Sequence, residues 1–284
     1  MSLAARRDGE GFCDSVSLDF TDPDGGASGL LRVDRWPGGG RAASLGLVLE
    51  GDSAELARSE VDVEPPADWG SVELGGVRLS DDGQRARGTF TADGAGFEIE
   101  ATRLGGAAFE PGSAFCDAAG LTQELFAARV KGEWRAGDTQ GQINSLGRLI
   151  RSAGEIDWDR IELLRSLTAV LEDGSLLAVA SARPAGVSGH GEEAASALLL
   201  DSDGSLTRFE EPLLSTEYDA AGSHRRAGVE LWGSDEDAAA LRGAGTRFAG
   251  AATELGGTRL ETAFLSFTLD GAPGTARYDL MRRA

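Results

Sequence analysis

Short runs in which apolar and polar residues alternate fill most of the chain. Residues 15–20 read SVSLDF, where every second residue is apolar, and this period of two is typical of a strand with one buried face. The turn-forming stretch TDPDGG follows. The runs at 28–36 and 41–50 then continue the pattern on either side of PGGG. The first half of the chain is therefore predicted to be a meander of short strands.

The second half repeats this arrangement. Turn sequences EDG, SDG and DGAPG interrupt the apolar stretches 163–184, 194–214 and 258–283, and Asp-Gly between apolar runs is a strong hairpin signal. Helical patterns are few. Residues 119–130 fit a short helix or the start of a strand, and residues 234–245 fit a short helix or a turn. VEPPADWG at 63–70 is expected to be a long loop.

The pattern indicates an all-β protein with about eight or nine strands in each half. Closing each sheet would remove its exposed edges. We therefore predict two tandem antiparallel β-barrel domains with little helix, one over residues 1–154 and one over 155–284. The 41 glycines, spread between the apolar runs, suit the many turns that this fold requires.

Composition limits the classes of partner. The chain has 47 acidic and 27 basic residues, a net charge of −20, which disfavours binding to nucleic acid or to an anionic membrane surface. Its two cysteines, Cys13 and Cys116, form neither a disulfide framework nor a Cys-x-x-Cys zinc motif. No apolar run reaches the roughly 20 residues that span a bilayer. We expect a cytoplasmic protein without membrane insertion, metal site or cofactor, and the oligomeric state stays open.

The stretch GQINSLGRLIRSAGEIDW, residues 141–158, resembles the central motif of a known family. This is the lipocalin-like double β-barrel family of AttH-type proteins and carotenoid 1,2-hydratase, whose pattern is Gly-x-x-Asp-His-x-Trp-Gly followed by an aromatic residue. Gly147 and Gly154 match the two glycines, and Trp158 matches the aromatic. VKGEW before the motif and LEDGSLLAV after it also fit. The resemblance implies two lipocalin-like barrels and an apolar pocket.

The positions that carry the family's chemistry differ in this chain. Ile150 stands in place of the aspartate, Arg151 in place of the histidine and Ala153 in place of the tryptophan. Hydration of an isolated double bond requires a general acid; isoleucine has no proton to donate, and arginine stays protonated at any working pH. We therefore interpret residues 147–158 as a structural strand and turn without the family's hydratase activity.

Binding of a hydrophobic small molecule, lipid-like or isoprenoid-like, is the leading functional hypothesis, with the ligand in a barrel cavity or at the seam between the domains. Trp134 and Trp158 are expected to wall the pocket. Arg148 and Arg151 are expected to orient a carboxylate or hydroxyl of the ligand, and Asn144 is a further candidate contact.

Two alternatives stay open. In the first alternative, the protein is an enzyme that acts on a terpenoid or lipid, such as a hydratase, cyclase or isomerase, with Asp157 or Asp159 as its acid. In the second, it is a structural or interaction protein whose barrels hold no cavity. His190 and His224 lie in glycine-flanked polar sequences and are expected to be solvated loop residues. The remaining tryptophans, Trp36, Trp69 and Trp232, are expected to serve in packing.

Overall fold

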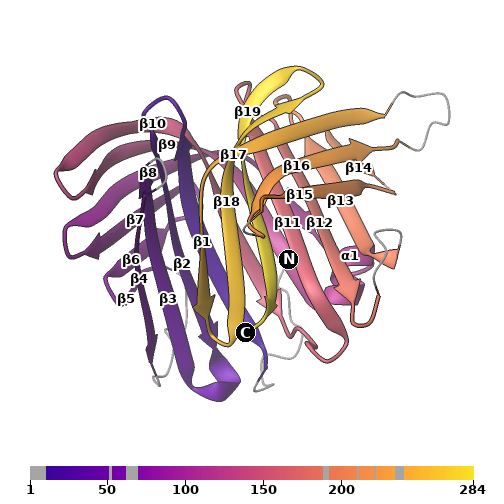
Figure 1. The fold of residues 1–284 in the computed structure, drawn as a ribbon, viewed down its shortest axis with the longest axis horizontal. Helices are drawn as coiled ribbons and strands as arrows, with labels where there is room; N and C mark the ends of the chain where they lie inside the picture. Colours follow the sequence, from indigo (N-terminus) through magenta and orange to yellow (C-terminus); the bar gives the residue numbers. More distant parts are fainter. Residues whose placement is uncertain are drawn as a thin grey trace.

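Two antiparallel sheets hold nearly all of the regular structure (Figure 1). The computed structural model describes residues 11–50, 53–61, 70–187, 192–209, 211–220, 222–233 and 240–284. The first sheet contains β1 (Cys13–Asp22), β2 (Ala27–Trp36), β3 (Arg41–Glu50), β4 (Ser53–Val61), β5 (Val72–Leu74), β6 (Val77–Asp81), β7 (Arg85–Ala92), β8 (Ala95–Phe109), β9 (Leu121–Ala136) and β10 (Thr139–Gly154). The second contains β11 (Ile161–Leu171), β12 (Leu176–Pro184), β13 (Ala194–Leu200), β14 (Leu206–Phe209), β15 (Leu213–Tyr218), β16 (His224–Leu231), β17 (Leu241–Leu255), β18 (Thr258–Leu269) and β19 (Ala272–Arg283).

Both sheets have the same topology. Strands that follow each other in the sequence pair in space, and the first strand of each sheet pairs with its last, β1 with β10 and β11 with β19. The order is interrupted once per sheet, between β4 and β5 and between β14 and β15. Each sheet thus curls into a barrel-like meander, which confirms the predicted all-β fold of two tandem antiparallel barrels.

Alternation along β1 shows how the sequence positions the two faces. Val16, Leu18 and Phe20 point into the first barrel, where they belong to a cluster of buried apolar side chains. Asp19, on the other face, is also fully buried because it meets Arg277 of the second sheet. A polar position in an alternating strand therefore faces the partner sheet here, where the pattern alone would place it in water.

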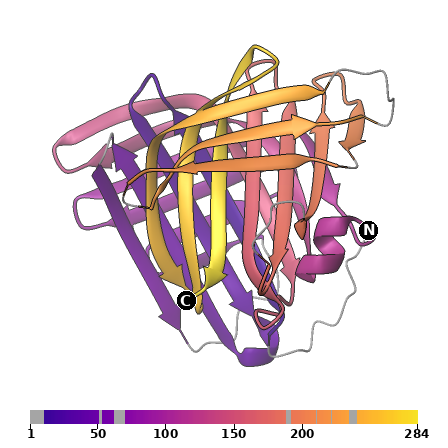
Figure 2. The same ribbon diagram turned by 45° about the vertical axis from the view of Figure 1, so that its right-hand side comes forward.

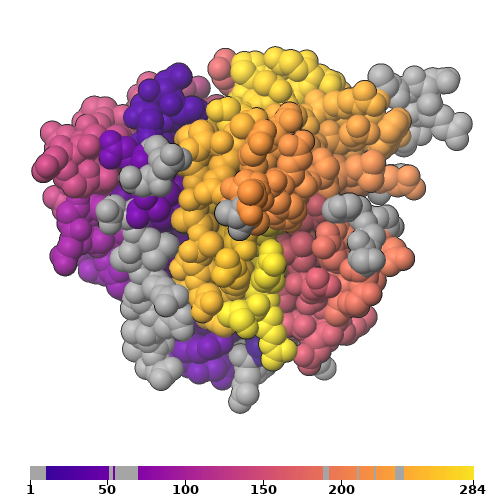
Figure 3. Space-filling model, viewed as in Figure 1, coloured from indigo at the N-terminus to yellow at the C-terminus, as the bar shows by residue number. Residues whose placement is uncertain are grey.

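The two sheets pack against each other through a shared apolar core. This core joins residues of both sheets, including Leu45 and Leu125 from the first and Leu164 and Phe264 from the second. The C-terminal strands consequently lie directly against the N-terminal strands, and β17 contacts β3 (Figure 3). The last strand of the first sheet ends at Gly154, and the first strand of the second sheet begins at Ile161. The division into two domains at residue 154 stays a prediction.

The one α-helix among the described residues is α1 (Ala114–Ala119), which includes only the first residue of the stretch 119–130; from Leu121 on, that stretch is strand β9. Ser113 caps its N-terminus and Gly120, with φ of 69°, ends it; the chain then continues as β9. The helix packs against β12 and β13 at the side of the second sheet (Figure 2). A 3₁₀ turn lies at Pro37–Gly39.

Some predictions fall on residues that the structure does not describe. Residues 63–69 of the expected loop, among them Trp69, lie outside the described ranges. His190 also lies outside them. Of the stretch 234–245, residues 241–245 belong to strand β17 and residues 234–239 lie outside. Within the described ranges, no helix has the length and apolarity needed to cross a lipid bilayer.

Candidate functional site at the seam

The predicted site stretch, residues 147–158, forms the end of β10 and the turn that leads to β11. Arg148 and Arg151 were expected to act together, but they lie on opposite faces of β10. Three residues separate them, and side chains alternate along a strand. Arg148 therefore points to the seam between the sheets, while Arg151 lies on the same face as Leu149, which belongs to the core of the first barrel.

Arg148 is fully buried in a network of charged groups that crosses the seam. Its Nε donates to Asp19 Oδ1 at 2.8 Å, its Nη1 donates to the carbonyl oxygen of Thr275 at 3.0 Å, and its Nη2 donates to the hydroxyl of Thr21. The second oxygen of Asp19 accepts from Nη1 of Arg277 at 2.7 Å. Arg148 thus ties the two sheets together, with all three nitrogens engaged.

Arg151 belongs to a separate polar group inside the first barrel. It pairs with the buried carboxylate of Asp81, which also accepts from Nη2 of Arg103 at 2.5 Å. The guanidinium of Arg103 lies over the ring of Phe126, 3.9 Å from its centroid. Glu124 lies 3.9 Å from Arg151. These contacts give Arg151 a role in filling the end of the barrel, away from the seam.

The other predicted residues are dispersed. Trp134 is buried among the apolar side chains of the first barrel, and Asn144 is exposed on β10. Trp158 is partly buried and packs on the core at the seam. Asp157 and Asp159 are both exposed; Asp159 pairs with Arg283 at 2.9 Å, and its side chain is 88% exposed. The assignment of all five of these residues to a ligand site stays a prediction.

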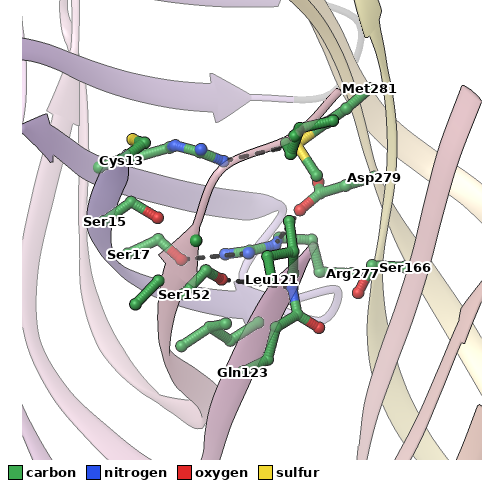
Figure 4. Close-up of a pocket in the computed structure, with 15 residues that line it drawn as sticks. Cys13, Ser15, Ser17, Leu121, Gln123, Ser152, Ser166, Arg277, Asp279 and Met281 are labelled. Atoms are coloured by element: carbon green, nitrogen blue, oxygen red, sulfur yellow. Dashed lines mark hydrogen bonds and ion pairs between the residues drawn. The ribbon is translucent and has the colours of Figure 1, made fainter. Parts of the chain in front are cut away.

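A small cavity of about 60 Å³ lies at the seam (Figure 4). We call it the seam cavity. Strands β1, β2, β9 and β10 line it from the first sheet, and β11 and β19 line it from the second. Its walls are formed by Cys13, Ser15, Ser17, Arg32, Leu121, Gln123, Ile150, Ser152, Ala153, Gly154, Ile156, Ser166, Arg277, Asp279 and Met281.

The strand register explains why these residues meet. Ser15 pairs with Ser152, which in turn pairs with Gln123, so one row across β1, β10 and β9 presents three polar side chains to the seam. On the second sheet, Ser166 pairs with Asp279 and faces that row. Ile150, which occupies the position of the family's aspartate, also lines the cavity.

Most of the charged groups in the cavity already have partners. Arg277 donates to Asp19, to Asp279 at 3.0 Å and to Ser17 at 3.1 Å. The carboxylate of Asp279 also accepts from the hydroxyl of Thr262 at 2.8 Å. Burial raises the pKa of the Cys13 thiol well above its usual range, and the nearby Asp34 adds to this rise, so the thiol is neutral and a poor nucleophile at pH 7.

The uncharged Gln123 differs from these charged groups, because one of its polar atoms has no partner. Its side chain is 4% exposed, and its Nε2 donates to the hydroxyl of Ser152 at 3.3 Å. Its Oε1 is buried with no hydrogen-bond partner among the described residues. A buried amide oxygen without a partner costs about 1–3 kcal/mol, so this acceptor in a cavity marks a place where a donor from a ligand or a water would be stabilising.

A larger and mostly apolar cavity of about 290 Å³ adjoins the first. We call it the outer cavity. Leu121, Ala153 and Gly154 line both cavities, so the two cavities lie next to each other. Phe12, Pro111 and Cys116 supply much of the remaining apolar surface, and the complete lining adds Asp117, Gly120, Thr122 and Glu155. Together the two cavities combine a polar end with an apolar space.

His224 was expected in a solvated loop, and this expectation is wrong. It is the first residue of β16 and only 2% exposed, with its ring edge-to-face on Tyr278 at 5.2 Å between centroids. Burial lowers its pKa, with a further lowering by the nearby Arg247. Neither ring nitrogen meets a hydrogen-bond partner among the described residues, and Nδ1 lies 3.9 Å from a carboxylate oxygen of Glu261.

Comparison with known proteins supports the fold. The chain superposes on an AttH-type protein from Nitrosomonas europaea with a TM-score of 0.70 and 14% identity, over 95% of this chain and 91% of that one. The corresponding values for CghA are 0.64 and 13%, over 97% and 89%. For kievitone hydratase from Nectria haematococca they are 0.58 and 9%, over 97% and 89%. No family model and no curated protein matches the sequence. The chain has the lipocalin-like double-barrel fold that its central motif suggested.

Proposed function

We propose that this protein binds a small molecule with an apolar body and one polar end, held between its two barrels. The polar end would occupy the seam cavity beside Gln123, and the apolar body would occupy the outer cavity. The unpartnered amide oxygen of Gln123 supports this proposal most strongly, because an orphaned buried acceptor in a cavity calls for a donor.

Binding, without the hydratase activity that one structural neighbour's name records, fits the groups in the cavity. Ile150 offers no proton. Asp279 already accepts hydrogen bonds at both oxygens, from Arg277 and Thr262, and is held by these groups of the protein. The neutral thiol of Cys13 supplies no strong acid either. We therefore infer a binding protein whose cavity has lost its proton donor.

Native mass spectrometry of the gently purified protein tests this proposal. We expect an additional mass that corresponds to a bound lipid-like or isoprenoid-like molecule. Organic extraction should remove this molecule, and the additional mass should then disappear. Ser166→Leu places a bulky side chain in the seam cavity, so the variant should lose the bound mass while it stays folded. Ser215→Leu is the matched control, because Ser215 is exposed on β15. A wild-type protein that takes up no apolar molecule, or a Ser166→Leu variant that retains it, contradicts the proposal.

A further inference from the structure

The seam cavity also shows which polar end it would accept. Three arginines and three aspartates form the charged network around it: Arg32, Arg148 and Arg277 with Asp19, Asp34 and Asp279. Each arginine has an aspartate partner within 3.0 Å, so the network is electrically balanced before any ligand enters.

A ligand carboxylate would disturb this balance. It would add a fourth negative charge near Asp279 and Asp34 without a new cation, and an uncompensated buried charge is strongly unfavourable. Arg277 already donates through each of its nitrogens to a group of the protein, to Asp279, Asp19 and Ser17, so its charge is shared between two aspartates. Arg32 donates to Asp34 at 2.8 Å, and among the described residues its other contact is the sulfur of Met281 at 3.8 Å. Arg32 therefore keeps N–H groups free, but a carboxylate bound there would have no hydrogen to give to the amide oxygen of Gln123.

An uncharged hydroxyl matches the groups that remain. Gln123 Oε1 needs a donor. Ser152 Oγ accepts from Gln123 Nε2, and its own hydrogen is left to donate. A hydroxyl group donates one hydrogen and accepts others, so it can satisfy both side chains at once. Ser152 and Gln123 are register partners on β10 and β9, which places the two contacts side by side.

We propose that the seam cavity recognises the neutral hydroxyl of an apolar alcohol and discriminates against the corresponding carboxylate, with Gln123 as acceptor and Ser152 as donor. This inference rests on the proposed function, because it assumes that the apolar body lies in the outer cavity. It assigns the ligand class as alcohols and makes Gln123 the residue that determines specificity.

Isothermal titration calorimetry with 1-octanol and with sodium octanoate at pH 7.5 tests it. We expect the protein to bind 1-octanol roughly tenfold more tightly than octanoate. Gln123→Met keeps the size and removes the acceptor, so it should lower octanol affinity about five- to tenfold and leave octanoate affinity unchanged. Gln142→Met is the matched control, because Gln142 is exposed on β10, and it should bind as the wild type does.

Ser152→Ala provides a second, smaller change, which should reduce octanol affinity several-fold and guards against misfolding of the first variant. If the wild type binds neither probe, the proposed function itself fails. If it binds both probes equally, or octanoate more tightly, or if both variants keep the preference for octanol, the inference about the hydroxyl is wrong while binding at the seam stands.

Discussion

How much an ion-paired residue contributes to the stability of this protein depends on whether the pair is buried or exposed. Arg148 and Arg78 are both strand arginines paired with a carboxylate, but Arg148 is fully buried and the Arg78 side chain is 67% exposed beside Glu73. Loss of Arg148 leaves the buried Asp19 with Arg277 alone, and Arg277 is shared with Asp279. Loss of an exposed partner leaves a carboxylate that water solvates.

Arg148→Ala is therefore expected to lower the free energy of unfolding by about 3–5 kcal/mol, whereas Arg78→Ala should leave it unchanged within error. Urea denaturation followed by circular dichroism measures both. Equal effects of the two substitutions would show that the seam network contributes no stability beyond that of a surface pair.

His224 gives a prediction about pH. Its model-peptide pKa is 6.5 and burial lowers the pKa in the folded state. Below pH 6.5 the unfolded chain therefore binds a proton that the folded chain does not, and the free energy of unfolding falls as the pH drops through this window. His224→Phe should reduce that fall, measured by urea denaturation at pH 7.5 and pH 5.5. An unaltered difference between the two pH values would rule out a folded-state histidine held neutral.

At the scale of the strand, alternation predicted the elements well. The hairpins around EDG, SDG and DGAPG are present as β11–β12, β13–β14 and β18–β19, because a hairpin depends on residues close in the sequence. The same alternation places Arg148 and Arg151 on opposite faces of a strand, because three residues' spacing is an odd number; the expectation that both contact one ligand conflicts with it.

The location of Arg148 and Arg151 on opposite faces of β10 can be tested by measuring the affinity for 1-octanol. Arg151→Ala should change the affinity for 1-octanol by less than roughly twofold, because the side chain lies inside the first barrel with Asp81 and is separated from the seam by the sheet. Calorimetric titration gives the comparison. A tenfold loss would mean that Arg151, as the sequence suggested, does contact the ligand.

At the scale of the whole molecule, the seam was the part that local patterns missed. Ser15, Ser17 and Asp19 alternate with apolar residues and have the pattern of a solvated face; Arg277 and Asp279 do the same on β19. Only the packing of one sheet on the other shows that these polar faces meet. The sequence thus predicted the type of elements and came close to their number, since about eight or nine strands were expected in each half and the sheets contain ten and nine. The central motif suggested the double barrel, while the composition of the cavity required non-local contacts.

The shared core predicts that the two barrels unfold together. Apolar residues of both sheets form one cluster, so separation of the sheets would expose much of it to water. Urea unfolding followed by far-ultraviolet circular dichroism and by tryptophan fluorescence should give coincident single transitions. Two transitions with different midpoints would instead indicate barrels that are stable independently.

The central claim is that an apolar alcohol lies across the seam with its hydroxyl at Gln123. A crystal structure of the protein soaked with 8-bromo-1-octanol tests it most directly, because the anomalous signal locates the bromine. We predict bromine in the outer cavity near Phe12 and Cys116, with continuous density reaching Gln123 and Ser152. Bromine inside either barrel, or in the outer cavity with the hydroxyl turned to solvent, would contradict the account.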